Sequence, residues 1–262
     1  MTPIIDIPWT HLSFAVIFIV ILLGVSLYES LKLERTILLG TFRATVQLIL
    51  VGFVIQKVFE IQSWPMILVI LVVMVFTASQ TLIKRLKKPV RGTYTYALIA
   101  VSGASLLSVY ISSQLIIGVN PWYEARYLIP LGGMIIANGM NGATLAGERY
   151  RSELSLRVAE IEMLLSLGFD SRKASLKARQ QAITAALLPS LNNMMVLGIV
   201  HLPGMMTGQI IAGADPVTAV KYQLVIILSI SGTVALTSWI FLSLLDRRYF
   251  TPHHQFRYDL IQ

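Results

Sequence analysis

The sequence contains no cysteine and few charged residues, and both absences restrict what the protein can be. Without cysteine, disulfides, thiolate metal sites and cysteine nucleophiles are excluded. Charged residues make up 13% of the chain, against about 25% in soluble domains. The sequence has no HExxH, GxSxG or GxxxxGK[ST] motif. These absences argue against an intramembrane enzyme and exclude ATP binding through a phosphate-binding loop.

What the sequence does contain is apolar residues in long blocks. They make up 55% of the chain, and the mean hydropathy is +0.72. Blocks longer than about 18 residues predict membrane-spanning helices, so we expect an all-α, polytopic membrane protein. Seven spans are predicted, with approximate bounds 9–28, 38–59, 65–83, 94–117, 127–147, 183–200 and 220–245. No linker interrupts them, and we expect a single transmembrane domain over residues 1–262, whose first span is retained rather than cleaved as a signal peptide.

The basic residues divide unequally between the two sides of this predicted topology. Seventeen of the 21 Lys and Arg lie in alternate loops and the tail, whereas the opposite loops hold only Lys57, Arg126 and Lys221. Such an excess marks the cytoplasmic side, which predicts an outside N-terminus and an inside C-terminus in the cytoplasmic membrane. The net charge of +8 thus reflects membrane topology, and lipid rather than nucleic acid is the expected partner.

A charged segment, Glu148–Pro189, separates the fifth and sixth spans, and its part 148–182 is predicted to be cytoplasmic. Residues 153–167 carry an amphipathic helical pattern, with Glu153, Arg157 and Glu160 on the polar face, and Gly168 supplies a helix stop. Asp170 or Ser171 can cap a second, basic helix. The segment either docks onto a partner protein through its apolar face or consists of two helices lying on the membrane surface.

Polar side chains within the predicted spans are candidates for a translocation path, because they are costly in a bilayer unless they are paired or line a path. The polar candidates are Arg43, Gln47, Asn138, Asn141, Asn192 and Asn193. Met205 and Met206, which follow the sixth span, are added to them. The alternatives are that the amides join helices and that Arg43 extends to the interface.

A second group has side chains that can bind a divalent metal transiently: Met194, Met195, His201 and Asp215. A transport site must release its ion, so sparse ligands suit it. Alternatively, the methionines fill gaps between helices, and Asp215 with Pro216 caps the helix that leads into the last span. Residues 202–214 are either a loop or a re-entrant segment. The pair His253-His254 is interpreted as a solvated terminus.

Three stretches resemble one family. Glu162, Leu167 and Gly168 look like the EAA loop of ABC-transporter permeases, although Met163-Leu164 replaces the alanines. Leu188-Pro189 also lies farther from the glycine than in that motif. Together IPLGGMIIANGMNG (129–142), LSLGFDSRKA (165–174) and LPGMMTGQIIAGADPVTAVKYQ (202–223) resemble the FetB/YbbM-type permeases of iron-export ABC transporters, which have plant relatives in aluminium tolerance.

The resemblance implies a non-enzymatic permease subunit that exports iron or another metal. It would act as a homodimer, bind no cofactor itself, and depend on a separate cytoplasmic ATPase subunit that holds ATP and Mg²⁺. Residues expected to couple to that ATPase are Glu160, Glu162, Leu165, Leu167, Gly168 and Arg172. The alternatives are an ATP-independent channel or scaffold and an ABC permease for a non-metal substrate.

Overall fold

The structure, a computed structural model, describes residues 7–260. Across that range the chain forms helices joined by turns, with two isolated β-bridges and no strand, so the all-α prediction is confirmed there. The chain divides into two compact units. Unit 1 comprises Met1–Gln62 with Ile211–Gly213, and unit 2 comprises Ser63–Ile210 with Ala214–Gln262.

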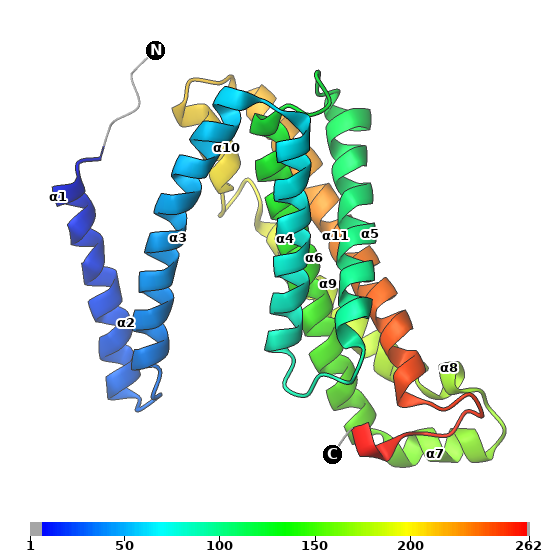
Figure 1. The fold of residues 1–262 in the computed structure, drawn as a ribbon. Coiled ribbons are helices and arrows are strands. Elements are labelled where there is room, and N and C mark those ends of the chain that lie inside the picture. The colour runs from blue at the N-terminus through cyan, green and yellow to red at the C-terminus, as the bar shows by residue number, and fades with distance from the viewer. Residues whose placement is uncertain (1–6, 261–262) are drawn as a thin grey trace. The chain divides into compact units, whose positions relative to one another are not determined.

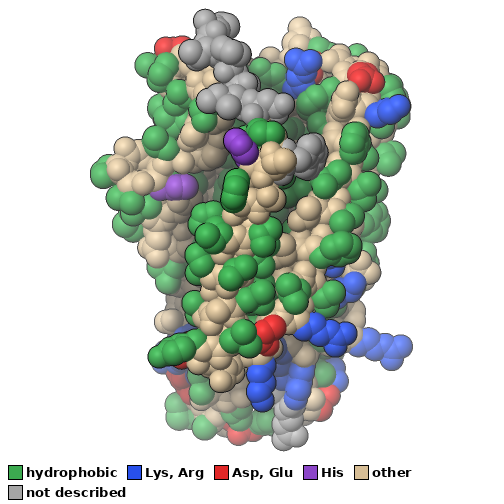
Figure 2. Space-filling model, turned by 90° about the vertical axis from the view of Figure 1, so that its left-hand side faces the viewer, with side chains coloured by type: hydrophobic (Ala, Val, Ile, Leu, Met, Phe, Trp, Pro, Cys, Tyr) green, Lys and Arg blue, Asp and Glu red, His purple; other side chains and the backbone are tan. Residues whose placement is uncertain are grey.

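Five helices in the described range are long and apolar enough to cross a membrane. They span Thr10–Tyr28, Glu34–Ile61, Trp64–Arg85, Thr93–Ile117 and Pro216–Tyr249. On the face shown in Figure 2, hydrophobic side chains are spread along the middle of the molecule and Lys and Arg gather mainly toward one end. These features support a multi-pass membrane protein. The count of seven spans stays a prediction, because helices α6 (Ala125–Leu156) and α9 (Leu176–Val196) are too polar to meet the same criterion.

Unit 1 is a helical hairpin. Its elements are α1 (Trp9–Leu12), a 3₁₀ turn (Ser13–Ala15), α2 (Val16–Tyr28) and α3 (Glu34–Ile61). Ser26 closes the hairpin, since its hydroxyl donates to Glu34 Oε1 at 2.8 Å and accepts from the Leu33 amide at 3.3 Å. Most side chains of α2 and α3 are apolar and exposed, as expected where lipid or another chain surrounds a hairpin.

Unit 2 is a bundle centred on α6 (Figure 1). Its helices are α4 (Trp64–Arg85), α5 (Thr93–Tyr110) with a π-helical extension (Ile111–Ile117), α6 (Ala125–Leu156), α7 (Val158–Ser166), α8 (Ser171–Ala174), α9 (Leu176–Val196), α10 (Gly204–Ile211), α11 (Pro216–Tyr249) and a 3₁₀ turn (Tyr258–Leu260). Helix α6 packs against α4, α5, α9 and α11, and most extensively against α11.

Glycine permits the close contact between α6 and α11. A Cβ atom added at Gly142 would lie 2.6 Å from Val234 Cγ1, and one at Gly139 would lie 2.9 Å from Thr237 Oγ1. Both distances are shorter than side chains tolerate, so the two helices can approach this closely only where α6 has no side chain. Helix α6 is therefore the fixed centre against which α9 and α11 are positioned.

The charged segment departs from prediction at its start. The expected helix over residues 153–167 is divided at Arg157, where α6 ends and α7 begins. Glu153, expected on a polar outer face, is buried, and its carboxylate binds Arg149 at 2.6 Å and Arg157 at 2.8 Å. These two arginines offset the cost of burying the carboxylate, which a helical repeat alone does not reveal.

The later part of the segment follows the predicted local signals. Gly168 has a φ of +85°, the left-handed conformation that ends a helix. The Asp170 side chain accepts from the Lys173 amide at 2.8 Å and caps α8. Helix α8 is short, however, and α9 begins at Leu176, well before the predicted sixth span. Residues 204–211 form the short helix α10.

Candidate functional site

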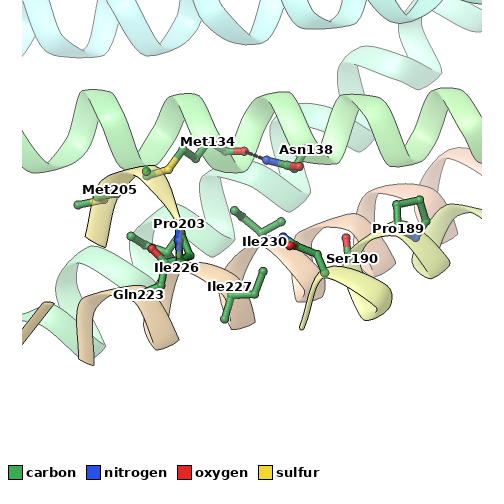
Figure 3. Close-up of a pocket in the computed structure, with 12 residues that line it drawn as sticks. Met134, Asn138, Pro189, Ser190, Pro203, Met205, Gln223, Ile226, Ile227 and Ile230 are labelled. Carbon is green, nitrogen blue, oxygen red and sulfur yellow. Dashed lines mark hydrogen bonds between the residues drawn. The ribbon is translucent and has the colours of Figure 1, made fainter. Parts of the chain in front are cut away.

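A cavity of about 280 Å³ lies within unit 2, among α6, α9, α10 and α11. Isoleucines of α11 and the prolines Pro189 and Pro203 form its apolar wall (Figure 3). Its polar and sulfur-bearing lining residues are Met134, Asn138, Ser190, Asn193, Met205 and Gln223. None of the described residues that line it is charged. The cavity therefore presents amide, hydroxyl and thioether groups against an apolar background.

Two prolines lie at the cavity, one within α9 and one just before α10. Pro189 lies inside α9 and cannot donate a backbone hydrogen bond to the preceding turn. Pro203 comes immediately before α10 and precedes its first residue, Gly204. On α6, the Asn138 amide nitrogen donates to the Met134 carbonyl at 2.8 Å (Figure 3). That bond uses one of the two N–H donors of Asn138, and its side-chain oxygen remains as the group that can accept.

Gln223 is the most informative group in the cavity. Its Oε1 atom is buried and has no hydrogen-bond partner within the described part of the chain. A buried acceptor without a partner is costly, by about 1–3 kcal/mol. Amide oxygens and thioethers together bind cations weakly and without a fixed charge. The arrangement can thus hold a cation transiently and release it, as a transport site must.

The structure brings together three of the predicted path residues. Asn138, Asn193 and Met205 line the same cavity, from α6, α9 and α10. Sequence reasoning missed Met134 and Gln223. Met134 lies one helical turn before Asn138 and therefore on the same face of the helix, so the spacing could have identified it. Gln223 lies at the end of the 202–223 motif, but only the packing of α11 places it in the cavity.

The remaining path candidates lie elsewhere. Asn141 accepts from Arg85 Nη1 at 2.7 Å, so it joins α6 to α4. Met206 lines a neighbouring cavity of about 170 Å³, which Gln223 also borders. Asn192 is exposed. Arg43 and Gln47 are exposed on α3 in unit 1.

The four metal candidates do not form a cluster of charged ligands. Met194 Sδ accepts from the Ser231 hydroxyl at 3.3 Å, and Met195 and His201 are exposed. The Asp215 carboxylate caps α11 by accepting from the Thr218 amide at 2.8 Å, which lowers the Asp215 pKa. Over residues 7–260, no group of three or more His, Cys, Asp or Glu side chains could hold a metal ion. Asp215 thus fits the capping alternative.

Helix α7 lies across one end of the unit 2 bundle (Figure 1). Only its Ile161 is buried. Its exposed surface carries Glu162 and Met163 and continues through Leu167 to Phe169 beyond the helix end. Of the predicted coupling residues, Glu162, Leu167, Gly168 and Arg172 are exposed, while Glu160 and Leu165 are half-buried. The apolar and charged side chains of this surface are available for contact with another protein.

Glu160 fixes α7 to its neighbours. Its carboxylate accepts a hydrogen bond from Lys177 at the start of α9 and binds Arg157 at 3.1 Å. The hydrogen bond from Lys177, and to a smaller extent that from Arg157, lowers the Glu160 pKa. Because α9 also carries Ser190 and Asn193, the link connects the exposed helix with a helix that lines the cavity.

The C-terminal residues also reach this segment. The His254 ring nitrogen Nδ1 accepts from the Ser171 amide at 3.2 Å. A cavity of about 700 Å³ lies between α7 and this tail, lined by Glu162, Leu165 and residues 253–256 among others. His253 and His254 are both exposed, which agrees with the interpretation as a solvated terminus, and His254 also contacts the start of α8.

The long apolar helices of the chain define a multi-pass membrane protein. The model of the uncharacterised protein family UPF0014 matches residues 9–250, and the chain belongs to that family. It is 34% identical to the UPF0014 membrane protein YjkA of Bacillus subtilis over 95% of this chain and 98% of YjkA.

Other relatives carry functional names. The chain is 30% identical to the probable iron export permease protein FetB of Escherichia coli, over 93% of each chain. It is 29% identical to the protein ALUMINUM SENSITIVE 3 of Arabidopsis thaliana, over 92% of this chain and 88% of that protein. The resemblance to FetB-type permeases and their plant relatives is thereby confirmed. No solved structure matches the chain.

Proposed function

We propose that this protein is the membrane-spanning permease subunit of an ABC transporter that exports iron, or another metal, across the cytoplasmic membrane. ATP is hydrolysed by a separate cytoplasmic subunit, and two copies of the chain form the pathway. The N-terminus lies outside and the C-terminus inside.

The observation that carries the proposal is the exposed surface of α7 and the turn after it. Met163 is 57% exposed and Leu167 is 69% exposed, next to the exposed charge of Glu162. Apolar anchors beside charges are the composition of a helix that docks into a groove. The chain has no phosphate-binding loop of its own, so energy from ATP has to enter through a partner.

The link through Glu160 supports a route from the motor to the cargo. A partner that displaces α7 acts on Lys177 and hence on α9, whose Pro189 lies at the cavity. Proline weakens the helix locally and allows it to bend there. Movement of α9 would change the access of Ser190 and Asn193 to the two sides of the membrane.

The cargo assignment rests on the cavity chemistry and on the relative FetB. Amide oxygens and thioethers accept metal cations, and their lack of charge suits release. The relative FetB, a probable iron export permease, is the basis for iron and for the direction of export. No step in this mechanism requires chemistry within this chain.

The docking part can be tested by co-purification with the ATPase subunit. Glu162→Lys reverses a charge on the exposed surface, and Gly168→Pro cannot adopt the φ of +85° that ends α7. Both variants should insert in the membrane but lose the ATPase. Glu29→Lys, the same change in the α2–α3 turn, is the control that keeps it. Retention of the ATPase by both Glu162→Lys and Gly168→Pro would refute docking.

The cargo part needs a separate measurement of cell metal content. Cells that lack the protein should accumulate iron relative to cells that express it, while other metals serve as internal controls. Lower iron in the deletion strain would indicate import. An unchanged content of every metal would favour a non-metal substrate.

A further inference from the structure

A second cavity, of about 430 Å³, lies at the end of unit 2 where α5 begins and α11 ends. It is lined by Val90, Arg91, Gly92, Arg248, Arg257 and Leu260. Three of these six residues are arginines, which come from the α4–α5 loop, from the last turn of α11 and from the C-terminal tail. The 280 Å³ cavity among α6, α9, α10 and α11 shares no lining residue with it.

The positive charge of this cavity is only partly neutralised. Arg257 Nη2 binds Asp259 Oδ2 at 2.9 Å. Among the residues between 7 and 260, no carboxylate forms an ion pair with Arg91 or with Arg248. Like charges that converge without a counterion repel one another. An anion in the cavity would remove that repulsion.

The position of Arg248 is fixed by a neutral partner. Its Nε donates to the Tyr96 hydroxyl at 2.6 Å, and its guanidinium carbon lies 5.5 Å from the centre of the Tyr96 ring. Tyr96 therefore orients the guanidinium and leaves its charge available. Gly92 has a φ of +89°, and a Cβ atom there would lie 3.2 Å from Arg248 Nη2. Glycine thus leaves the room that the guanidinium occupies.

The start of α5 adds to the positive potential. This helix begins at Thr93, next to Gly92, and runs for 18 residues. The first turn of a helix carries a partial positive charge, which favours anions. Arginine side chains and a helix start at one place form a combination that binds phosphate groups.

We propose that this cavity binds a phosphate-bearing anion, which at the membrane surface is the headgroup of an anionic phospholipid. The bundle end concerned is the one that the distribution of Lys and Arg assigns to the cytoplasm. Basic cavities between helices on that side are suited to lipid phosphates. Arg91 and Arg248 supply forked donors, and Arg257 closes the site from the tail. A bound headgroup would hold the C-terminal residues against the start of α5.

The test is a titration of the full-length protein in neutral detergent with phosphatidylglycerol, with bound lipids counted by native mass spectrometry. Arg91→Gln and Arg248→Gln should each weaken the tightest binding step about fivefold. Arg91 has no bond to a described side chain, so its loss should not disturb folding. Arg247→Gln is the matched control, because this exposed neighbour of Arg248 does not line the cavity.

Phosphatidylcholine and inorganic phosphate complete the experiment. If inorganic phosphate displaces phosphatidylglycerol, the shared phosphate chemistry is supported and soluble phosphates are also ligands. If it does not, whereas the two arginine variants still weaken binding, the ligand is the lipid. Equal affinity of Arg91→Gln, Arg248→Gln and Arg247→Gln for phosphatidylglycerol, or equal binding of phosphatidylcholine, would overturn the proposal.

Discussion

The Tyr150 hydroxyl of α6 donates a hydrogen bond to the buried Asp246 carboxylate of α11. Arg179 of α9 joins them, with its Nη1 atom 3.7 Å from Asp246 Oδ2 and its Nη2 donating to the Ser243 hydroxyl at 3.1 Å. The group connects α6, α9 and α11, the helices that supply most of the lining of the 280 Å³ cavity. This group therefore fixes α9 and α11 to α6.

Removal of the Tyr150 hydroxyl should weaken this junction. In Tyr150→Phe the buried carboxylate loses its closest partner, at an expected cost of about 1–3 kcal/mol. The unfolding midpoint in detergent should fall. Tyr110→Phe, in which the altered ring is exposed, should leave the midpoint unchanged. An unaltered midpoint for Tyr150→Phe would mean that Arg179 alone satisfies Asp246.

The features of the fold that were predictable from sequence are local ones. The stop at Gly168 and the caps at Asp170 and Asp215 depend on a few neighbouring residues, and the structure has all three. The break at Arg157 was not predictable, because it depends on the burial of Glu153 between two arginines. Helical periodicity identifies a face but does not show what covers it.

Packing of α6 against α11 provides a second prediction. Gly142→Ala would place a Cβ atom 2.6 Å from Val234 Cγ1. Valine is rigid at χ1 and cannot move aside easily, so the helices must separate, at a cost of about 1–3 kcal/mol. Thermal unfolding measures the loss, and Val234→Ala in the same chain should restore part of it.

Gly208→Ala is the matched control for that experiment. Gly208 lies within α10, and a Cβ atom there would meet nothing within 4 Å. Because alanine favours the helix over glycine, this variant should be as stable as the parent or more stable by up to about 1 kcal/mol. If both glycine variants behaved alike, close contact at Gly142 would not explain the packing.

The candidate site was also predictable only in part, because the sequence does not show which side chains pack around one space. Asn138 and Asn193 are unusual because amides are rare in apolar spans, so composition alone indicates them. Met134 and Gln223 have no such distinction, and their role follows from the packing of α6, α10 and α11 around one space. Asn141 has the same composition signal but bonds to Arg85, which only the structure reveals.

The link between α7 and α9 should depend on pH. The hydrogen bonds from Lys177 and Arg157 hold the Glu160 pKa below its ordinary value of 4.5. A carboxyl with a lowered pKa stabilises the fold above its ordinary pKa, and the contribution disappears as the pH falls through the lowered value. We expect α7 to be fixed at neutral pH and to loosen well below pH 4.5.

The absence of native cysteine makes this measurable by spin labelling. Labels at Ser166→Cys on α7 and Gln180→Cys on α9, both exposed, should give a narrow distance distribution at neutral pH and a broad one in acid. Glu160→Gln, which cannot form the charged pair, should be broad at both. A narrow distribution for Glu160→Gln at neutral pH would show that other contacts fix α7.

The last prediction separates stability from transport at Gln223. Its buried Oε1 has no partner in the described chain, so Gln223→Leu removes an unsatisfied acceptor and should raise the unfolding midpoint. The same change removes an oxygen from the 280 Å³ cavity that we propose binds the cargo. Export of the metal should therefore fall even though the protein is more stable. The two effects are measured by thermal unfolding in detergent and by metal efflux from loaded vesicles that contain the ATPase.

Gln209→Leu distinguishes this outcome from a general effect of removing an amide. Gln209 of α10 also has a buried Oε1 without a partner in the part of the chain described, but it does not line the cavity. It should gain stability and keep its transport rate. A group that lowers stability is expected where it binds a ligand. If Gln223→Leu alone raises stability and lowers export, Gln223 is identified as a cargo contact. Equal transport by both variants would remove Gln223 from the path and leave Asn138 and Asn193 as its amide groups.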